Sequence, residues 1–261
     1  MIWVGTDKGL NRFDAVKNEF TEILKDGIDN NIIYDIYEDK NKTIWFATYN
    51  NGLVSFNKKT QEWNTITVND KVCPLSSNKL ICLLDDHMGN LWIGTDGGGL
   101  NKFSFKTRQV KIYGNNVGIN GNVIYGIQQD EDGTIWVTTN NGIYNFNPET
   151  EKVKHFTRQD NLQSQQFNYK AFYKASDGKM FAGGIKGFNA FYPEKLSGAG
   201  TNTRISFTNF QLFNKTVSLT EDESPLKKEI NYTHNLVLKY NQSVLSFEFA
   251  ALNFNAPEKK Y

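Results

Sequence analysis

The chain begins with short apolar runs that alternate with polar, turn-forming segments. Residues 32–66 contain one complete example of this pattern. Strands are predicted at 32–37, 43–48, 53–56 and 63–66. The turn before the third strand ends in Asn51-Gly52, a pair typical of tight hairpins. One such unit is therefore a four-stranded antiparallel meander.

The same unit recurs with a fixed order of landmarks. An aromatic residue in the second strand is followed after six or seven residues by glycine, and four residues later by phenylalanine. The aromatic residues are Trp3, Trp45, Trp92, Trp136 and Phe181, spaced 42, 47, 44 and 45 residues apart. This period indicates β-propeller blades, because a lone meander buries its apolar face only against a neighbouring one.

The two ends of the chain depart from the repeat. The first copy begins at its second strand, and the fifth stops at Pro193 before a fourth strand. We therefore expect residues 1–196 to form a partial propeller of about five repeats, the first and last incomplete, with further sequence upstream. From 203 to 261, longer strands are predicted at 205–213, 236–240 and 244–252, as the opening of an antiparallel sandwich. The whole chain is expected to be all-β.

Composition and charge narrow the class of function. Hydrophobic residues make up 39% of the chain and aromatic residues 14%, enough for a packed core. The 29 basic and 28 acidic residues balance, which argues against contact with nucleic acid. No apolar run approaches the roughly 20 residues of a membrane span, and no signal peptide is apparent. Cys73 and Cys82 have neither disulfide-framework nor metal-ligand spacing.

Candidate catalytic and metal-binding groups are sparse. Asp130-Glu131-Asp132-Gly133 faintly resembles a calcium loop, but the further ligands and the distal glutamate are missing. Gly97-Gly98-Gly99 is followed by no helix that would complete a phosphate cradle. His87, His155 and His234 recur in no repeat and have no nucleophile or paired carboxylate near them in sequence. We expect no catalytic residue, no metal and no cofactor.

Three segments carry a family resemblance. Leu91–Phe103 resembles the two-component regulator propeller repeat, and Gln166–Pro193 resembles the last blade of such propellers. Arg204–Tyr261 resembles the first part of the Ig-like Y_Y_Y domain that follows them. This order is typical of the sensor region of hybrid two-component systems, with a histidine kinase, in Bacteroides-type bacteria.

The resemblance implies a longer protein. Its members have two seven-bladed propellers, the sandwich, a membrane helix, a histidine kinase, a receiver and a DNA-binding domain. The resemblance implies a periplasmic location for this chain, as the sensor part of an inner-membrane protein that touches the membrane only through the parent chain. It also implies an oligosaccharide ligand, released from a complex glycan, and a homodimer formed through the sandwich and further segments.

One end of the propeller is the expected ligand-binding face. Turns between second and third strands meet there with the loops that lead into each first strand. Asparagine, aspartate, glutamine, arginine and tyrosine in these loops suit a sugar, which needs planar donors and acceptors and an aromatic stacking face. The candidate residues are Tyr49, Asn50, Asp96, Asn140, Arg158, Gln165, Gln166 and Asn168. The alternative for each is plain turn chemistry, because hairpins favour the same residues.

Three functions remain open from the residues. A sensor that binds a glycan-derived oligosaccharide, and so regulates polysaccharide utilisation, follows from the order of the two domains. A scaffold propeller that binds a protein partner would be favoured by exposed aromatic residues without a concave pocket. An enzyme would need a convergent acid/base set, and the sequence offers none.

Overall fold

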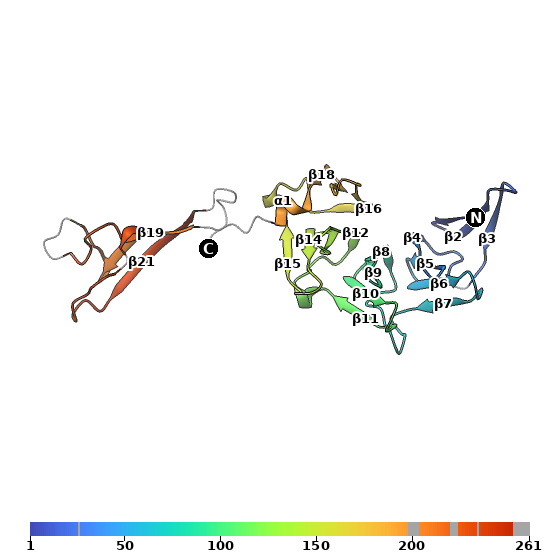
Figure 1. Cartoon of the computed structure of the whole chain (residues 1–261), viewed down its shortest axis with the longest axis horizontal. Helices are drawn as coiled ribbons and strands as arrows, with labels where there is room; N and C mark the ends of the chain where they lie inside the picture. The colour runs from blue at the N-terminus through green and yellow to red at the C-terminus, as the bar shows by residue number, and fades with distance from the viewer. Residues whose placement is uncertain (26, 198–203, 220–223, 234, 253–261) are drawn as a thin grey trace. The chain divides into compact units, whose positions relative to one another are not determined.

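The computed structural model describes residues 1–25, 27–197, 204–219, 224–233 and 235–252 (Figure 1). The chain divides into two compact units, Met1–Leu196 and Ser197–Tyr261, which are described separately. In the part of the chain that the structure describes, no helix is long and apolar enough to cross a membrane.

The first unit consists of five antiparallel sheets in sequence order, here called blades 1 to 5. Blade 1 contains β1 (Ile2–Thr6), β2 (Gly9–Asp14) and β3 (Glu19–Ile23), and blade 5 contains β16 (Phe167–Lys174), β17 (Met180–Gly184) and β18 (Gly187–Phe191). Blade 2 contains β4 (Ile33–Glu38), β5 (Thr43–Thr48), β6 (Leu53–Asn57) and β7 (Trp63–Ile66). Blade 3 contains β8 (Leu80–Asp85), β9 (Asn90–Thr95), β10 (Leu100–Ser104) and β11 (Val110–Tyr113). Blade 4 contains β12 (Ile124–Gln129), β13 (Ile135–Thr139), β14 (Gly142–Phe146) and β15 (Val153–Phe156).

Short helices connect or follow the blades: η1 (Asn115–Val117) after blade 3, η2 (Arg158–Asp160) after blade 4 and α1 (Pro193–Ser197) after blade 5. The three middle sheets have four strands and the terminal two have three. The all-β fold of propeller blades predicted from the repeat is therefore confirmed.

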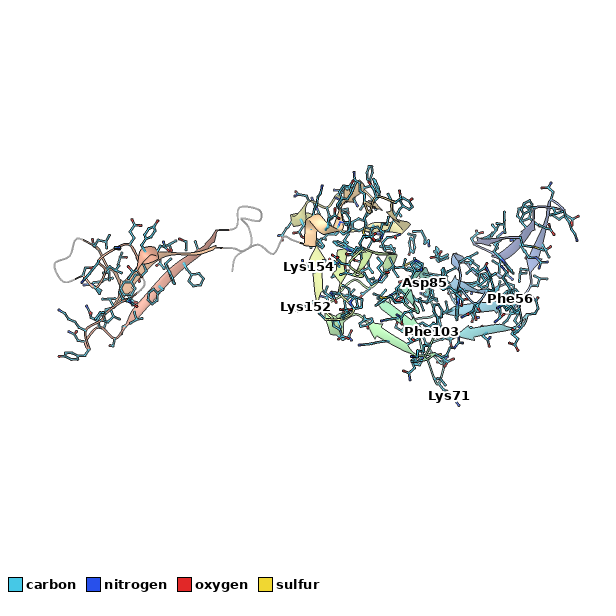
Figure 2. All side chains as sticks on the ribbon, in the orientation of Figure 1. Phe56, Lys71, Asp85, Phe103, Lys152 and Lys154 are labelled. Atoms are coloured by element: carbon cyan, nitrogen blue, oxygen red, sulfur yellow. The ribbon has the colours of Figure 1, made fainter. Side chains whose placement is uncertain are left out.

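The first strands of blades 2 to 5 are the inner strands β4, β8, β12 and β16. Each contacts the inner strand of the next blade, and they line the concave side of the row of blades (Figure 1). Phe56 and Phe103 fill the space between neighbouring blades, whereas Lys154 lies on the outer strand β15 and Lys152 directly before it (Figure 2). The core of this unit therefore lies between sheets.

Three blades share a buried aspartate–tryptophan pair. Trp45, Trp92 and Trp136 are each at most 2% exposed. Their indole N–H groups donate to the carboxylates of Asp39, Asp86 and Asp130 at 2.9, 3.1 and 2.8 Å, respectively. The same carboxylates accept backbone N–H groups of the turn that follows. An aspartate six residues before each tryptophan thus closes the turn and also satisfies a buried indole, a second role that the spacing alone does not reveal.

Blade 5 lacks both members of this pair. Phe181 stands at the tryptophan position and Ala175 at the aspartate position. A phenylalanine ring has no N–H group, so an aspartate at position 175 would have no indole to accept a hydrogen bond from. In blades 2 to 5 the aspartate and the tryptophan are therefore either both present or both absent.

Small residues let neighbouring inner strands approach one another. A Cβ added to Gly94 would lie 2.4 Å from Cys82 Sγ and 2.8 Å from Ile124 Cγ2 of the next blade. A Cβ added to Gly126 would lie 2.6 Å from Phe172 Cβ. Side chains at these positions would force the strands apart, which explains the glycine two residues after Trp92.

The second unit is a short hairpin sheet in the order β20-β19-β21. Its elements are β19 (Arg204–Leu212), β20 (Lys215–Thr216), η3 (Ile230–Tyr232) and β21 (Leu245–Leu252). The strand predicted at 236–240 is wrong, because no strand forms there and Val237 and Tyr240 are 82% and 100% exposed. The outer edges of β20 and β21 have no partner strand among the described residues, so the apolar run at 236–240 has not joined this sheet. Residue 203 and residues 253–261 lie outside the described part of the chain.

Candidate ligand-binding site

Four blades bring tyrosines and a carboxylate together at the start of the inner strands. We call Tyr34, Tyr49, Tyr125, Tyr169 and Asp96 the tyrosine cluster. The rings of Tyr34 and Tyr169 stack, with centroids 5.4 Å apart and planes 9° apart. Tyr125 meets Tyr169 edge-on at 4.8 Å, and Tyr34 meets Tyr49 edge-on at 5.6 Å. The Tyr49 hydroxyl donates to Asp96 Oδ2 at 2.9 Å.

A long bulge in β16 delivers Tyr169 to this cluster. In blades 2 to 4 the inner strand bulges by one residue at the same place, so that Tyr34 and Tyr125 fall on bulges. In blade 5, Phe167 pairs with Gly184 and Phe172 with Ala182, so the four residues 168–171 stand opposite one residue of β17. A bulge of this size interrupts the pairing with β17 and turns its side chains in new directions.

The same bulge joins two blades that are not neighbours. The ammonium of Lys170 forms an ion pair with Asp35 of β4, and Lys170 adopts a left-handed backbone with φ of 56°. Asp35 also accepts the backbone N–H of Leu83 in β8 at 2.7 Å. Repeat arrays normally make contacts only between adjacent units. Here blades 2, 3 and 5 are held together directly beside the tyrosine cluster.

The pKa values of three phenols of the cluster, Tyr49, Tyr125 and Tyr169, are raised. The hydrogen bond to Asp96, followed by burial, raises the pKa of Tyr49 to about 12. Burial raises the pKa of Tyr125 and of Tyr169, and the charge of Asp96 adds to both. At neutral pH these hydroxyls are therefore uncharged hydrogen-bonding groups.

The predicted site residues fall into two groups. Tyr49 and Asp96 belong to the tyrosine cluster, and the side chain of Gln166 acts on Tyr125, whose pKa it lowers against the larger effect of burial. Gln165, Gln166 and Asn168 are exposed where the chain leads into the β16 bulge. These five residues share the start of the inner strands.

The other three predicted residues lie in turns. Asn50 is exposed, and its backbone N–H donates to Asn31 Oδ1 at 3.2 Å. Asn140 Oδ1 accepts from the Val123 N–H at 3.4 Å. Arg158 lies in η2 after the outer strand β15, and no contact among the described residues joins it to the tyrosine cluster.

Sequence reasoning missed Tyr34, Tyr125, Tyr169, Asp35 and Lys170. One signal could have found part of this set, because Tyr34 and Tyr125 occupy the same position in their repeats, directly after a buried isoleucine. The long polar stretch between Leu162 and Phe172 gives a second signal, since the other blades have no counterpart to residues 168–171.

The remaining candidates have structural surroundings. The Asp130 carboxylate already accepts a hydrogen bond from the indole N–H of Trp136. The described residues contain no group of three or more His, Cys, Asp or Glu that could hold a metal. Gly97-Gly98-Gly99 lines a groove of about 240 Å³ together with the connection from blade 3 to blade 4. His87 Nδ1 lies 3.2 Å from Asp85, and His155 stacks on Tyr144. His234 lies outside the described residues.

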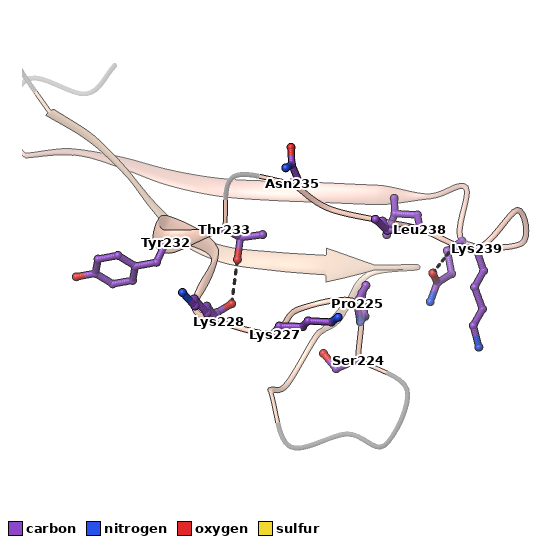
Figure 3. Close-up of a pocket in the computed structure, with 11 residues that line it drawn as sticks. Ser224, Pro225, Lys227, Lys228, Tyr232, Thr233, Asn235, Leu238 and Lys239 are labelled. Atoms are coloured by element: carbon purple, nitrogen blue, oxygen red, sulfur yellow. Dashed lines mark hydrogen bonds between the residues drawn. The ribbon is translucent and has the colours of Figure 1, made fainter.

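The second unit contains a separate hollow of about 640 Å³ (Figure 3). Lys227, Lys228, Tyr232 and Lys239 are among the side chains that line it. The Thr233 hydroxyl donates to the Lys228 carbonyl at 3.1 Å, which holds the turn at its rim. None of the polar side chains that line this hollow is buried, whereas the tyrosine cluster brings rings from three blades together with a carboxylate, so the cluster is the stronger candidate site.

Comparisons with known proteins agree with the repeat pattern. The family model for the two component regulator propeller matches residues 27–50, 74–97 and 118–141. A curated relative, Histidine kinase P4 of Formosa agariphila, is 23% identical over all of this chain and 23% of its own length.

Solved structures share the fold. The extracellular domain of BT4673 from B. thetaiotaomicron, described as a one component system, aligns with a TM-score of 0.59 and 22% identity over 98% of this chain and 46% of its own. A second structure of that domain, described as a hybrid two component system, aligns with a TM-score of 0.50 and 21% identity over 98% and 40%. The chain spans less than half the length of these relatives. Residues 27–50, 74–97 and 118–141 therefore carry the two component regulator propeller repeat, and this part of the predicted resemblance is confirmed.

Proposed function

We propose that the chain is part of the extracytoplasmic sensor region of a hybrid two-component signalling protein. The ligand is an oligosaccharide derived from a glycan, and its binding regulates polysaccharide utilisation. The first unit is the partial propeller, and the second is the first part of a Y_Y_Y domain. The names of the relatives, a histidine kinase and extracellular domains of B. thetaiotaomicron, support this proposal.

The tyrosine cluster is the observation that carries the ligand-binding role. Tyrosine rings offer apolar faces for the C–H faces of a sugar, and their hydroxyls donate and accept hydrogen bonds. Tyr169 is 46% exposed, so its ring is available to a ligand. Asp96, Gln165, Gln166 and Asn168 add polar groups around the same place. The set suits sugar recognition and lacks a nucleophile with its base, so we assign catalysis to a histidine kinase elsewhere in the parent protein.

Signal transfer is proposed to follow from the bulge of β16. A ligand on Tyr169 stabilises the arrangement in which this bulge joins blades 2, 3 and 5, and so favours one conformation of the sensor. In a homodimer formed through the second unit, that preference changes the geometry between partners. Cysteine crosslinking across the second unit in the parent protein, with and without oligosaccharide, should give different yields. Equal yields would contradict the mechanism.

Substitution of Tyr169 by alanine is expected to weaken oligosaccharide binding about tenfold or more, because it removes the exposed stacking face. Isothermal calorimetry of the 261-residue chain against a broad panel of glycan oligosaccharides measures the effect. Tyr173→Ala is the matched control, since Tyr173 is an exposed tyrosine of the same strand outside the cluster. Absence of binding across the panel, together with tight capture of a protein, would favour the scaffold function instead.

A further inference from the structure

We propose that the tyrosine cluster selects uncharged sugars and discriminates against sugars that carry a carboxylate or sulfate. The inference rests on the proposed function and goes further, because it names the chemical class of the ligand. The inference rests on the charged side chains beside the cluster, which are Asp96, Asp35, Lys170 and Lys79.

The charge closest to the tyrosine hydroxyls is negative. Asp96 accepts from Tyr49 through Oδ2, while its Oδ1 accepts no hydrogen bond from a described residue. The charge of Asp96 contributes to the raised pKa of Tyr49, Tyr125 and Tyr169. An anionic group placed against these rings would therefore be repelled, whereas a sugar hydroxyl could donate to Asp96 Oδ1.

The two lysines beside the cluster, Lys170 and Lys79, each already make a contact there. Lys170 forms an ion pair with Asp35, whose side chain is only 16% exposed. The Lys79 ammonium lies 5.4 Å from the centroid of the Tyr49 ring, the ring whose hydroxyl binds Asp96. Two lysines and two carboxylates leave the site without net charge. Carboxylate and sulfate recognition instead relies on cations free to bind the anion, most often a bidentate arginine.

The remaining polar groups are neutral. Gln165, Gln166 and Asn168 present amides where the chain leads into the β16 bulge, and the phenols stay protonated. Amides and phenols both donate and accept hydrogen bonds, as hydroxyl groups do. A site built of such groups around stacking rings matches a sugar bearing hydroxyls at every position.

The test uses pairs of oligosaccharides that differ only at C6. The 261-residue chain is titrated with 1,4-linked mannose and mannuronate tetramers, and with 1,4-linked glucose and glucuronate tetramers. At least one neutral member should bind about tenfold or more tightly than its acidic partner at low salt, a ratio typical of one like-charge contact. The ratio should shrink at about 0.5 M salt, because exposed charges are then screened.

Asp96→Asn removes the carboxylate and keeps the shape. It should bring the neutral-to-acidic ratio to within about threefold, whatever its effect on affinity as a whole. Glu131→Gln is the matched control: Glu131 is an exposed carboxylate beyond the far end of β12, paired with Lys174, and its removal should leave the ratio unchanged. Thermal unfolding of both variants verifies that they fold.

The outcomes separate the two proposals. Tighter binding of an acidic tetramer that is lost in Tyr169→Ala would overturn the charge selection and leave the oligosaccharide site standing. A ratio that Asp96→Asn does not change would also overturn the charge selection. If no member of either pair, and no sugar of the broad panel, binds, the proposed function fails and this inference fails with it.

Discussion

Substitution of Asp86 by alanine is expected to lower the free energy of unfolding by about 3 kcal/mol. Asp86 is 3% exposed, and its carboxylate accepts from the backbone N–H groups of Met88 and Asn90 and from the indole of Trp92. Alanine leaves that buried indole N–H without an acceptor, which costs more than the hydrogen bond itself contributes.

Urea denaturation of the 261-residue chain, followed by tryptophan fluorescence, measures this loss. Asp132→Ala serves as the control, because Asp132 is exposed and its substitution should change stability by less than about 0.5 kcal/mol. Adding Trp92→Phe to Asp86→Ala reproduces the combination found in blade 5. The double variant should lose less stability than the sum of the two single variants. Full additivity would show that the aspartate and the tryptophan do not act as a pair.

Substitution of Gly94 by alanine is expected to cost about 3 kcal/mol, at the upper end for an overpacked core. The added Cβ would lie 2.4 Å from Cys82 Sγ within blade 3 and 2.8 Å from Ile124 Cγ2 of blade 4. Both neighbours are buried, so relief requires a shift of one inner strand against the next.

The same denaturation experiment tests this substitution against Gly114→Ala. A Cβ at Gly114 meets no heavy atom within 4 Å, and the loss there should stay below about 1 kcal/mol. Equal losses at the two positions would mean that the spacing of the blades does not depend on Gly94.

The blades could be predicted from sequence because their packing is encoded within each repeat. The tryptophan, the small residues after it and the glycine of the hairpin all act within one meander or against the next. At Gly94, for example, Cys82 of β8 and Ile124 of the following blade leave no room for a Cβ. Such constraints recur at a fixed period, which makes them visible in one sequence.

The tyrosine cluster could be predicted only in part, because its contacts break that period. Tyr49 and Asp96 sit in repeated hairpin turns, so their position on one end of the blades follows from the repeat. The stack of Tyr34 on Tyr169 depends on two blades that are not adjacent and on a four-residue bulge, a length that β16 alone shows among the described inner strands. Nothing in the local pattern of residues 167–172 specifies which distant ring Tyr169 will meet.

The strand predicted at 236–240 failed for a related reason. Alternation of apolar residues reports that a segment suits a sheet, whereas a partner edge decides whether it joins one. Within the described residues, β19 already pairs with β20 and β21. Residues 236–240 pair with neither β20 nor β21, and Val237 and Tyr240 remain exposed.

The four-residue bulge in β16 also sets how many ligands one chain can hold. A site made from features common to all blades would recur around the row, once per repeat. Tyr169 and Lys170 occur on a bulge present in one blade, so their contacts with Tyr34 and Asp35 exist once. Calorimetric titration should therefore saturate at a single molar equivalent of oligosaccharide per chain. Several equivalents would instead point to the hairpin turns, where the repeat places similar groups many times.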